Sequence, residues 1–383
     1  MSIREERVLN VIKRHPGLSY IAVGQIGAMI LGAVFWLVVT RLLDPSGYGE
    51  VSWLFYITSL ASIVCLMGLR TTIITYYPKE GEEDLIGNAV LVVLISSLLV
   101  GVTMTLLLEP LAGPMVIGFS LFSIALSTEL AKRRYRRYMW ALIGTKLVAL
   151  FLAVWMYSWL GLLGVLLGYI IPLLIFGGSS LRYLHKRDPS MEGIRRKMNF
   201  ALKAFSTDIT RTAVNSFDKI LIGPIFGMAT LGLYQLAYQI FVALRILPSI
   251  LFSYLLPEKS AGIRTREVEV LGLIVSVIAT ILCIVLSPTI IPWLFPNFSK
   301  SIRLAQVMSL GLVPSTIVMV KMSELYAHER AGAVLISYIG AFTIGITSLL
   351  ILGTYFGSIG LATSTVLLRT ILAFILSLQT RRA

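Results

Sequence analysis

The sequence predicts an all-α polytopic membrane protein with about twelve transmembrane helices. Of its 383 residues, 57% are hydrophobic and only 14% are charged, whereas soluble domains carry about 25% charged residues. Apolar runs recur from one end of the chain to the other, each about 20 residues long, which is the length that a bilayer core about 30 Å thick requires. The strands of a membrane β-barrel would alternate polar and apolar residues over about ten positions, and the sequence has no such pattern.

The twelve expected spans are joined by mostly short polar connections. Their ends are uncertain by about four residues in either direction. The spans cover residues 20–40, 51–69, 88–108, 112–130, 140–159, 161–181, 204–224, 231–256, 268–290, 304–321, 333–352 and 358–378.

The basic residues indicate how these spans are oriented. Of the 33 Lys and Arg residues, 25 fall on the side that holds both termini, 3 fall on the other side and 5 lie inside spans. Short cytoplasmic loops carry an excess of Lys and Arg, so we expect a plasma-membrane protein with both termini in the cytoplasm. The net charge of +14 then reflects topology, and no nucleic-acid partner is expected. The run KRRYRRYMW at 132–140 is interpreted as a basic and aromatic anchor that attracts anionic lipid head groups.

The sequence indicates no cofactor, no metal site and no disulfide. Cys65 and Cys283 both fall inside expected spans, so no disulfide framework is implied. His15, His185 and His328 lie singly in expected loops, whereas a metal site needs clustered ligands. The charged start of the chain has no apolar core and predicts no removable signal peptide. The motifs of metalloproteases, P-loop NTPases and serine hydrolases do not occur, and we expect no enzyme activity.

The longest hydrophilic connection, residues 182–203, divides the chain into two six-span halves. We expect an N-terminal lobe over residues 1–190 and a C-terminal lobe over residues 191–383. The halves resemble each other weakly, because RLLDPSGYGEVSWLFY and YYPKEG in the first correspond to PIFGMATLGLYQLAY and LLPEKS in the second. Repeats in the same orientation are typical of secondary transporters that bind substrate between the repeats.

The expected seventh span contains AFSTDITRTAVNSFDKILIG at 204–223, which is charged although charge in hydrocarbon is costly. On a helix, its polar side chains fall within one face about 120° wide, and apolar side chains cover the rest. That polar face holds Asp208, Arg211, Thr212, Asn215, Asp218 and Lys219. The pattern predicts either a water-filled cavity along a transport pathway or a polar seam that joins helices.

The expected eighth span repeats this arrangement with aromatic residues. Tyr234, Tyr238 and Arg245 fall on one helical face, with Gln235 and Gln239 beside it. Tyrosines next to an arginine suit sugar rings and a phosphate. The alternative is that the tyrosines lie at the membrane interface and that the arginine bonds to a neighbouring helix.

Cations outnumber anions inside the spans. The basic residues are Lys146, Arg211, Lys219, Arg245 and Arg369, and the acidic residues clearly within spans are Asp208 and Asp218. Uncompensated charge is costly in a membrane, so the surplus predicts a site for an anion. Phosphate or pyrophosphate fits best because arginine binds it through two parallel hydrogen bonds.

Several segments together resemble the polysaccharide biosynthesis proteins of the Wzx-type oligosaccharide flippases. These segments are GQIGAMILGAVFWLVVTRLLDPSGYGEVSWLF, FDKILIGPIFGMATLGLYQLAYQ, and LLPEKS followed by IIPWLFPNFSKS. The shared motifs are a turn at Asp44 to Gly49, and Asp218 followed by Gly232 to Tyr234. The same superfamily includes the multidrug and toxin extrusion (MATE) transporters and the lipid II flippases, whose two additional spans this chain lacks.

The resemblance implies two six-helix lobes around a central cavity that opens alternately to each side. It also implies a substrate made of a polyprenyl chain, a phosphate or pyrophosphate, and an oligosaccharide. The leading interpretation is therefore a flippase that acts as a monomer on a lipid-linked oligosaccharide within membrane lipids. An exporter of cationic drugs and a membrane-bound sugar polymerase or ligase are the alternatives.

We assign expected roles on this basis. Arg211 and Arg245 contact the phosphate, and three further cations supply the surrounding positive field. The remaining head-group residues are Lys146, Lys219, Arg369, Asn215, Tyr234 and Tyr238. Asp218, with Asp208, is the expected carboxylate for coupling to H⁺ or Na⁺, and a fixed ion pair with Lys219 is the alternative.

Overall fold

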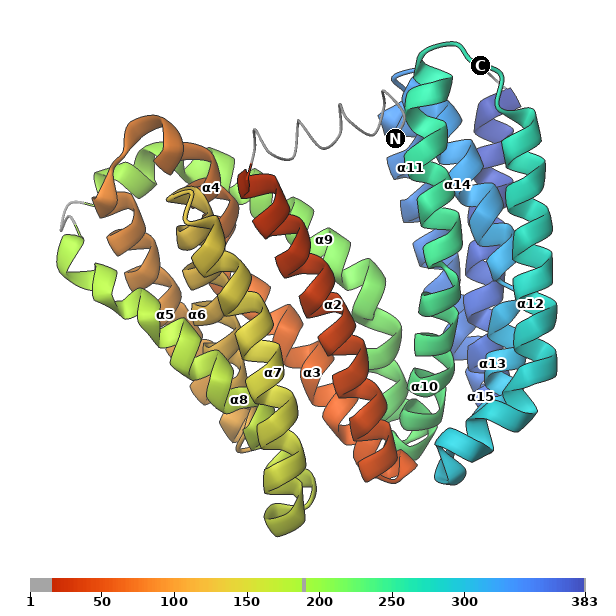
Figure 1. Ribbon diagram of the computed structural model, residues 1–383, viewed down its shortest axis with the longest axis horizontal. Coiled ribbons are helices and arrows are strands. Elements are labelled where there is room, and N and C mark those ends of the chain that lie inside the picture. Colours follow the sequence, from red (N-terminus) through yellow and green to blue (C-terminus); the bar gives the residue numbers. More distant parts are fainter. Residues whose placement is uncertain (1–15, 188–190, 382–383) are drawn as a thin grey trace. The chain divides into compact units, whose positions relative to one another are not determined.

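A computed structural model describes residues 16–187 and 191–381 (Figure 1). Every regular element in these ranges is a helix, and ten helical stretches are long and apolar enough to cross a membrane. The predicted all-α, polytopic fold is therefore confirmed. The N-terminal segment, with His15, lies outside the described residues.

The chain divides into two compact units. Unit 1 comprises Met1–Leu42 and Trp53–Phe217, and unit 2 comprises Leu43–Ser52 and Asp218–Ala383. The helices α3 and α9 each contribute to both units. The lobe boundary predicted between residues 190 and 191 adjoins residues outside the described ranges and stays a prediction.

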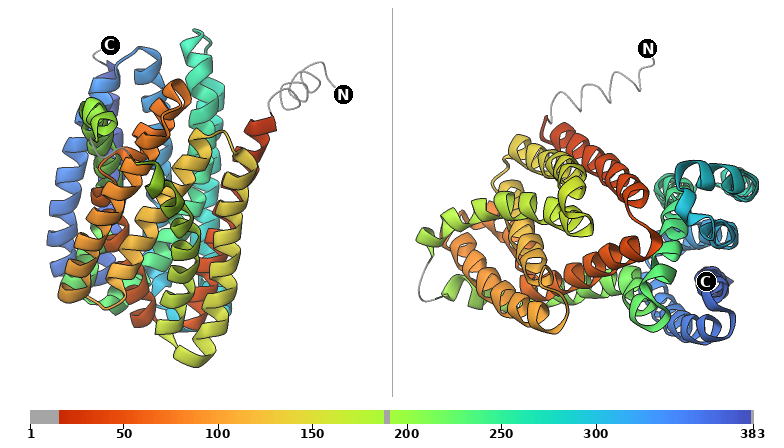
Figure 2. Two further views of the ribbon diagram at one scale, coloured as in Figure 1. Left: turned by 90° about the vertical axis from the view of Figure 1, so that its left-hand side faces the viewer. Right: turned by 90° about the horizontal axis from the view of Figure 1, so that it is seen from below.

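Unit 1 is built from nine helical elements among the described residues, of which α3 and α9 extend into unit 2. They are α2 (Pro16–Leu42), α3 (Pro45–Leu66), α4 (Leu69–Glu80), α5 (Glu83–Leu107), α6 (Ala112–Ala131), α7 (Tyr135–Leu160), α8 (Leu162–Gly178), the 3₁₀ helix η1 (Ser179–Lys186) and α9 (Glu192–Phe226). Within this unit α7 packs on α8 and α2, and α6 packs on α5 and α8. These helices run roughly along one common direction (Figure 2).

The helices of unit 2 follow. They are α10 (Met228–Leu244), α11 (Ile246–Ser260), α12 (Arg266–Leu294), the 3₁₀ helix η2 (Pro296–Phe298), α13 (Ser301–Ser309), α14 (Leu312–Ala327) and α15 (Ala331–Arg381). Within this unit α14 packs on α15 and α11, and α10 packs on α13.

Large apolar side chains cover the outside of the protein. Leu106, Phe151 and Trp159 are 79%, 70% and 78% exposed, whereas serine and threonine side chains such as Ser52 and Thr316 are fully buried. A water-soluble protein would bury the former and expose the latter. This distribution of apolar and polar side chains is expected for a protein whose outer faces contact the lipid of a bilayer.

Three expected spans lie in two helices, α9 and α15, that differ from a single straight apolar helix of membrane length. The charged span at 204–224 is the C-terminal part of α9, which begins twelve residues earlier, at Glu192, within the connection predicted at 182–203. The spans at 333–352 and 358–378 are both contained in α15, which is broken at Gly357. The φ of 58° at Gly357 is accessible to glycine because it has no Cβ.

The start of α3 packs closely on the start of α10 inside unit 2. Asp44 caps α3, because its carboxylate accepts hydrogen bonds from the backbone N–H of Ser46 and Gly47, at 3.4 and 3.1 Å. A Cβ on Gly49 would overlap the Met228 carbonyl oxygen. A Cβ on Gly232, in α10, would likewise overlap a carbonyl at the start of α3. The turn at Asp44 to Gly49 is therefore the place where α3 and α10 approach each other closely.

A set of ion pairs joins the elements at one end of unit 1. The Lys132 ammonium lies 2.7 Å from Glu83 Oε1 and 4.3 Å from the centre of the Tyr183 ring. Lys186 donates to the other oxygen of Glu83. The Lys132 side chain is only 5% exposed, so these contacts compensate for the loss of its hydration. They tie η1 and the α6–α7 turn to the start of α5.

A second set of ion pairs fixes the start of α9. The Lys197 ammonium lies 2.5 Å from Glu80 and 3.1 Å from Glu82. The hydrogen bond from Lys197 lowers the pKa of Glu82 and outweighs the opposing effect of burial. Burial alone would lower the pKa of Lys197, but its bonds to the two carboxylates raise it. The N-terminal part of α9 is thereby held against the end of α4.

Candidate functional site

A cluster of polar side chains lies inside unit 2, where α9, α10 and α15 meet. The hydroxyl of Tyr234 donates to Asp218 Oδ2 at 2.7 Å and lies 3.0 Å from the hydroxyl of Thr365. Tyr234 is fully buried, so these contacts satisfy a group that has no access to water. Sequence reasoning missed Thr365, although it is four residues before Arg369 and therefore on the same face of α15.

Lys219 is the buried cation of this cluster. Its side chain is 1% exposed, and its ammonium lies 2.9 Å from Asp218 Oδ1. The ammonium also lies 3.5 Å from the centre of the Tyr238 ring, and this ring stacks on Tyr234 with 6.0 Å between the centroids. Charge attraction and the aromatic face together stabilise an ammonium that water does not reach.

Arg245 lies at the junction between α10 and α11. Pro248 follows three residues later, and its ring excludes a helical hydrogen bond to the carbonyl of Leu244. The helix consequently ends at Leu244 and resumes at Ile246. Arg245 itself keeps a right-handed helical backbone, with φ −68° and ψ −7°.

The guanidinium groups of Arg245 and Arg369 lack partners for their Nε atoms. Both Nε atoms are buried and neither forms a hydrogen bond with any described residue. The two guanidinium groups lie close enough to repel each other. The phenol of Tyr238 lies within electrostatic range of both arginines, as well as of Lys219 and Asp218. Three cations therefore share this cluster with one carboxylate.

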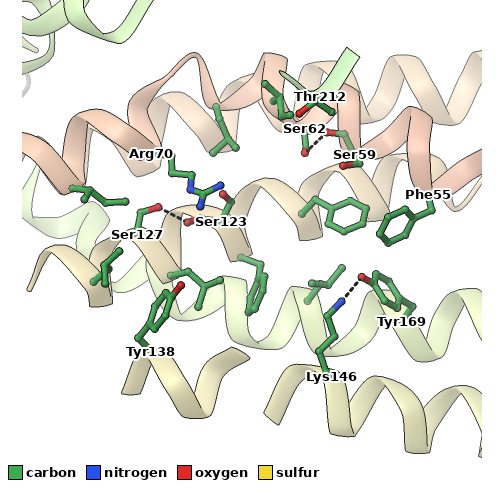
Figure 3. A pocket seen from close by; sticks show the side chains of 18 residues that line it. Phe55, Ser59, Ser62, Arg70, Ser123, Ser127, Tyr138, Lys146, Tyr169 and Thr212 are labelled. Carbon is green, nitrogen blue, oxygen red and sulfur yellow. Dashed lines mark hydrogen bonds between the residues drawn. The ribbon is translucent and has the colours of Figure 1, made fainter. Parts of the chain in front are cut away.

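Unit 1 contains a separate cavity of about 420 Å³ (Figure 3). Lys146, on α7, donates to the Tyr169 hydroxyl at 2.7 Å, and its ammonium lies 4.8 Å from the centre of that ring. Arg70, at the start of α4, also lines the cavity. Arg70 could not be singled out from the sequence, because it counts among the basic residues of an expected loop.

The predicted site residues are thus distributed over two units. Unit 2 brings together six of the predicted residues: Asp218, Lys219, Tyr234, Tyr238, Arg245 and Arg369. Unit 1 holds Lys146 in its cavity, and Asp208 and Arg211 on α9, where the Arg211 side chain is exposed. The side chain of Asn215 lies outside the described part of the structure. The predicted roles of all these residues stay predictions.

Several solved structures of membrane transporters are similar in fold to this chain. The inward-facing conformation of a multidrug resistance MATE family transporter of the MOP superfamily has a TM-score of 0.68 at 14% identity, over 96% of this chain and 97% of that one. The lipid II flippase MurJ in an inward closed conformation has a TM-score of 0.74 at 12% identity, over 94% and 87%. A MOP superfamily transporter from Pyrococcus furiosus has a TM-score of 0.56 at 13% identity, over 96% and 95%. At these identities the similarity establishes a shared fold.

The sequence matches no curated protein. A family model for polysaccharide biosynthesis proteins, however, matches residues 16–260, which is more than half of the chain. That range includes the close contact between α3 and α10 and five members of the unit 2 cluster, namely Asp218, Lys219, Tyr234, Tyr238 and Arg245. The chain is therefore a multi-pass membrane protein that belongs to the polysaccharide biosynthesis protein family.

Proposed function

We propose that this protein is a flippase that moves a lipid-linked oligosaccharide from the cytoplasmic to the outer leaflet by alternating access. The lipid tail stays in the bilayer, while the phosphate or pyrophosphate and its sugars cross through the protein. Membership of the polysaccharide biosynthesis family and the fold shared with a lipid II flippase support this proposal. The positive charge of the unit 2 cluster supplies the chemistry for an anionic head group.

The observation that carries this proposal is the pair of buried Nε atoms on Arg245 and Arg369, which have no hydrogen-bond partner among the described residues. A buried donor without a partner costs about 1–3 kcal/mol, and the Nε atoms of Arg245 and Arg369 are two such donors. An oxyanion between the arginines would accept these hydrogen bonds and remove their mutual repulsion. Phosphate suits the position because the planar guanidinium can bind it through two parallel hydrogen bonds.

We assign the other predicted residues to supporting roles in the same proposal. Lys219 adds positive charge to the cluster, and Tyr234 and Tyr238 form its wall. Arg211 is proposed to contact the phosphate as well, while Lys146 and Asn215 belong to the path of the head group. No cofactor takes part in this proposal. The protein is proposed to act as a monomer in the plasma membrane, with both termini in the cytoplasm.

Asp218 is the proposed coupling carboxylate, with Asp208 as a second one. Lys219 and the Tyr234 hydroxyl both contact Asp218, and Lys219 is its counter-charge. A proton or Na⁺ that bound Asp218 would replace Lys219 as its counter-charge. The ammonium would then be available to the phosphate, which would link ion binding to head-group binding.

Export of cationic drugs is the alternative function. The structural similarity to multidrug transporters is compatible with it, but the charges in unit 2 oppose it. Lys219, Arg245 and Arg369 would repel a cation, and Asp218 already contacts Lys219. An anionic substrate therefore fits this cluster better than a cationic one.

Binding measurements on the purified protein test the proposed function. A polyprenyl-pyrophosphate sugar should bind, and the uncharged polyprenol should bind much more weakly, because the pyrophosphate supplies most of the contacts to the arginines. A cationic drug should not compete. Equal affinity for the charged lipid and the neutral lipid would rule out an anion site.

A further inference from the structure

The cavity of unit 1 is lined by helices of that unit alone. Residues from α3, α4, α6, α7 and α8, with Thr212 from α9, line its volume of about 420 Å³. Small-molecule sites usually measure about 300–1,000 Å³, so this cavity can hold a short saccharide. Figure 3 shows Arg70 on one side of the cavity and Lys146 on the other, next to Tyr169.

The charge of this cavity is positive. Arg70 and Lys146 both line it, and no carboxylate occurs among the described residues that do so. The partner of Lys146 is the neutral Tyr169 hydroxyl, at 2.7 Å. An ammonium has three donors, so two of them stay available to a ligand. A ligand that carries one negative charge would therefore find a counter-charge on either side of the cavity.

Hydroxyl groups line the space around these cations. Four serines contribute, and two of them, Ser62 and Ser127, each donate to a backbone carbonyl of their own helix at 2.7 Å. Their oxygen lone pairs remain free to accept hydrogen bonds from a ligand. The other two, Ser59 and Ser123, line the cavity as well. Such a lining suits a ligand that has many hydroxyl groups.

Aromatic rings form the part of the cavity next to Lys146. The ring centroids of Phe55 and Tyr169 are 5.5 Å apart, and that of Phe119 lies 5.3 Å from Phe55 and 5.9 Å from Tyr169. The C–H face of a pyranose ring packs well on aromatic surfaces of this kind. A phosphate alone has no apolar face that could pack on these three rings.

We propose that the unit 1 cavity binds an anionic hexose, a pyranose ring that carries a carboxylate or a phosphate group. The ring lies on the three aromatic side chains, the serines bond to its hydroxyl groups, and Arg70 and Lys146 bind the negative group. This inference rests on the proposed function for the source of the sugar, which is the head group of the lipid-linked substrate. According to this inference, the cavity of unit 1 selects acidic sugars. The pyrophosphate binds at a separate site, in unit 2.

Binding of soluble sugars to the full-length protein tests this inference. Saturation-transfer NMR would compare methyl glucuronide, glucose 1-phosphate and neutral methyl glucoside. At least one anionic sugar should bind about tenfold more tightly than the neutral one. The stronger of the two anionic ligands identifies the negative group as a carboxylate or a phosphate. Equal binding of all three sugars, or no binding, would overturn the inference.

Variants locate the binding in the cavity. Lys146→Met and Arg70→Gln should each weaken binding of the anionic sugar about tenfold or more, because each removes a cation that faces its charge. Tyr169→Phe leaves both cations in place and should keep the preference for the anionic sugar. The matched control is Arg137→Gln, which removes an exposed arginine from the first turn of α7. Equal loss in the control and in Lys146→Met would refute the assignment to the cavity.

A second readout separates this inference from the proposed function. Arg70→Gln should keep its melting temperature and its affinity for a polyprenyl pyrophosphate without sugar. Arg245→Ala should lose that affinity and still bind the anionic sugar. If the unmodified protein binds the polyprenyl pyrophosphate but not the anionic sugar, the sugar site is wrong and the flippase proposal stands. If it binds the anionic sugar but not the polyprenyl pyrophosphate, only the pyrophosphate site is refuted.

Discussion

Arg245 and Arg369, whose Nε atoms are buried in unit 2, give the most direct test at the scale of single residues. Truncating a buried charge that bonds to a ligand costs about 2–5 kcal/mol, and every 1.4 kcal/mol is tenfold in affinity. Arg245→Ala and Arg369→Ala should therefore each lower affinity for a polyprenyl-pyrophosphate sugar at least about tenfold. Arg245→Lys keeps the charge but removes the planar guanidinium group. It should therefore reduce the affinity less than Arg245→Ala does.

The control for these variants is a pair of exposed arginines. Replacing Arg136 and Arg137 together by glutamine removes the same type of charge from a solvated position, where salt screens it. The double variant should keep nearly full affinity in the same binding assay. An effect as large as that of Arg245→Ala would mean that overall charge, and not a defined site, determines binding.

Asp218 allows the coupling proposal to be tested at one carboxylate. Asp218→Asn keeps the size of the side chain and removes the charge that Lys219 contacts. Transport should then no longer respond to a proton or sodium gradient, while binding of the head group remains measurable. Transport in proteoliposomes with and without an imposed gradient provides the measurement. A full response in the variant would show that Asp218 acts only as a structural ion pair.

At the scale of secondary-structure elements, the contact between α3 and α10 depends on two glycines. Gly49→Ala and Gly232→Ala should each lower the melting temperature in detergent, because overpacking costs about 1–3 kcal/mol. Gly32→Ala is the matched control, since a Cβ at Gly32 would meet nothing within 4 Å. It should be neutral or slightly stabilising because alanine favours helices. Equal melting temperatures for all three variants would contradict the close approach.

The ion pairs at the start of α9 predict a dependence on acid. The pKa of Glu82 is lower in the folded protein, so its stabilising effect is present above the unfolded value of about 4.3 and is lost as the pH falls through the folded value. Glu82→Gln should therefore lower the melting temperature at pH 7 and have little effect near pH 3. The exposed Glu109, changed to glutamine, is the control. An equal effect of Glu82→Gln at both pH values would exclude the pair with Lys197.

At the scale of the whole molecule, the distribution of basic residues predicts the topology. In a background in which Cys65 and Cys283 are replaced by alanine, single cysteines would report which side each turn faces. Cysteines at the exposed positions Leu160 and Tyr355 should react with an impermeant thiol reagent outside intact cells, and a cysteine at Ile263 should not. Reversed labelling would overturn the orientation and, with it, the uptake of head groups from the cytoplasm.

The fold class, the approximate spans and the family could all be predicted from the amino-acid sequence. These properties depend on features that are local in the chain, namely apolar runs of membrane length and short motifs such as the turn before Gly49. Because a lipid environment requires long apolar helices, composition alone is a strong signal. The five cations inside the spans were visible for the same reason, since charge stands out in an apolar run.

Which of these charges are neighbours could not be predicted, because it depends on how the helices pack. Arg369 comes from α15, far along the chain from Arg245, and packing brings both into one cluster with Lys219. Lys146 instead lies in a cavity of unit 1, with Arg70 as its second cation. A helical wheel assigns a side chain to a face, but it does not say which helix packs on that face. The grouping of the charges therefore follows from helix packing, which hydropathy and spacing along the chain do not encode.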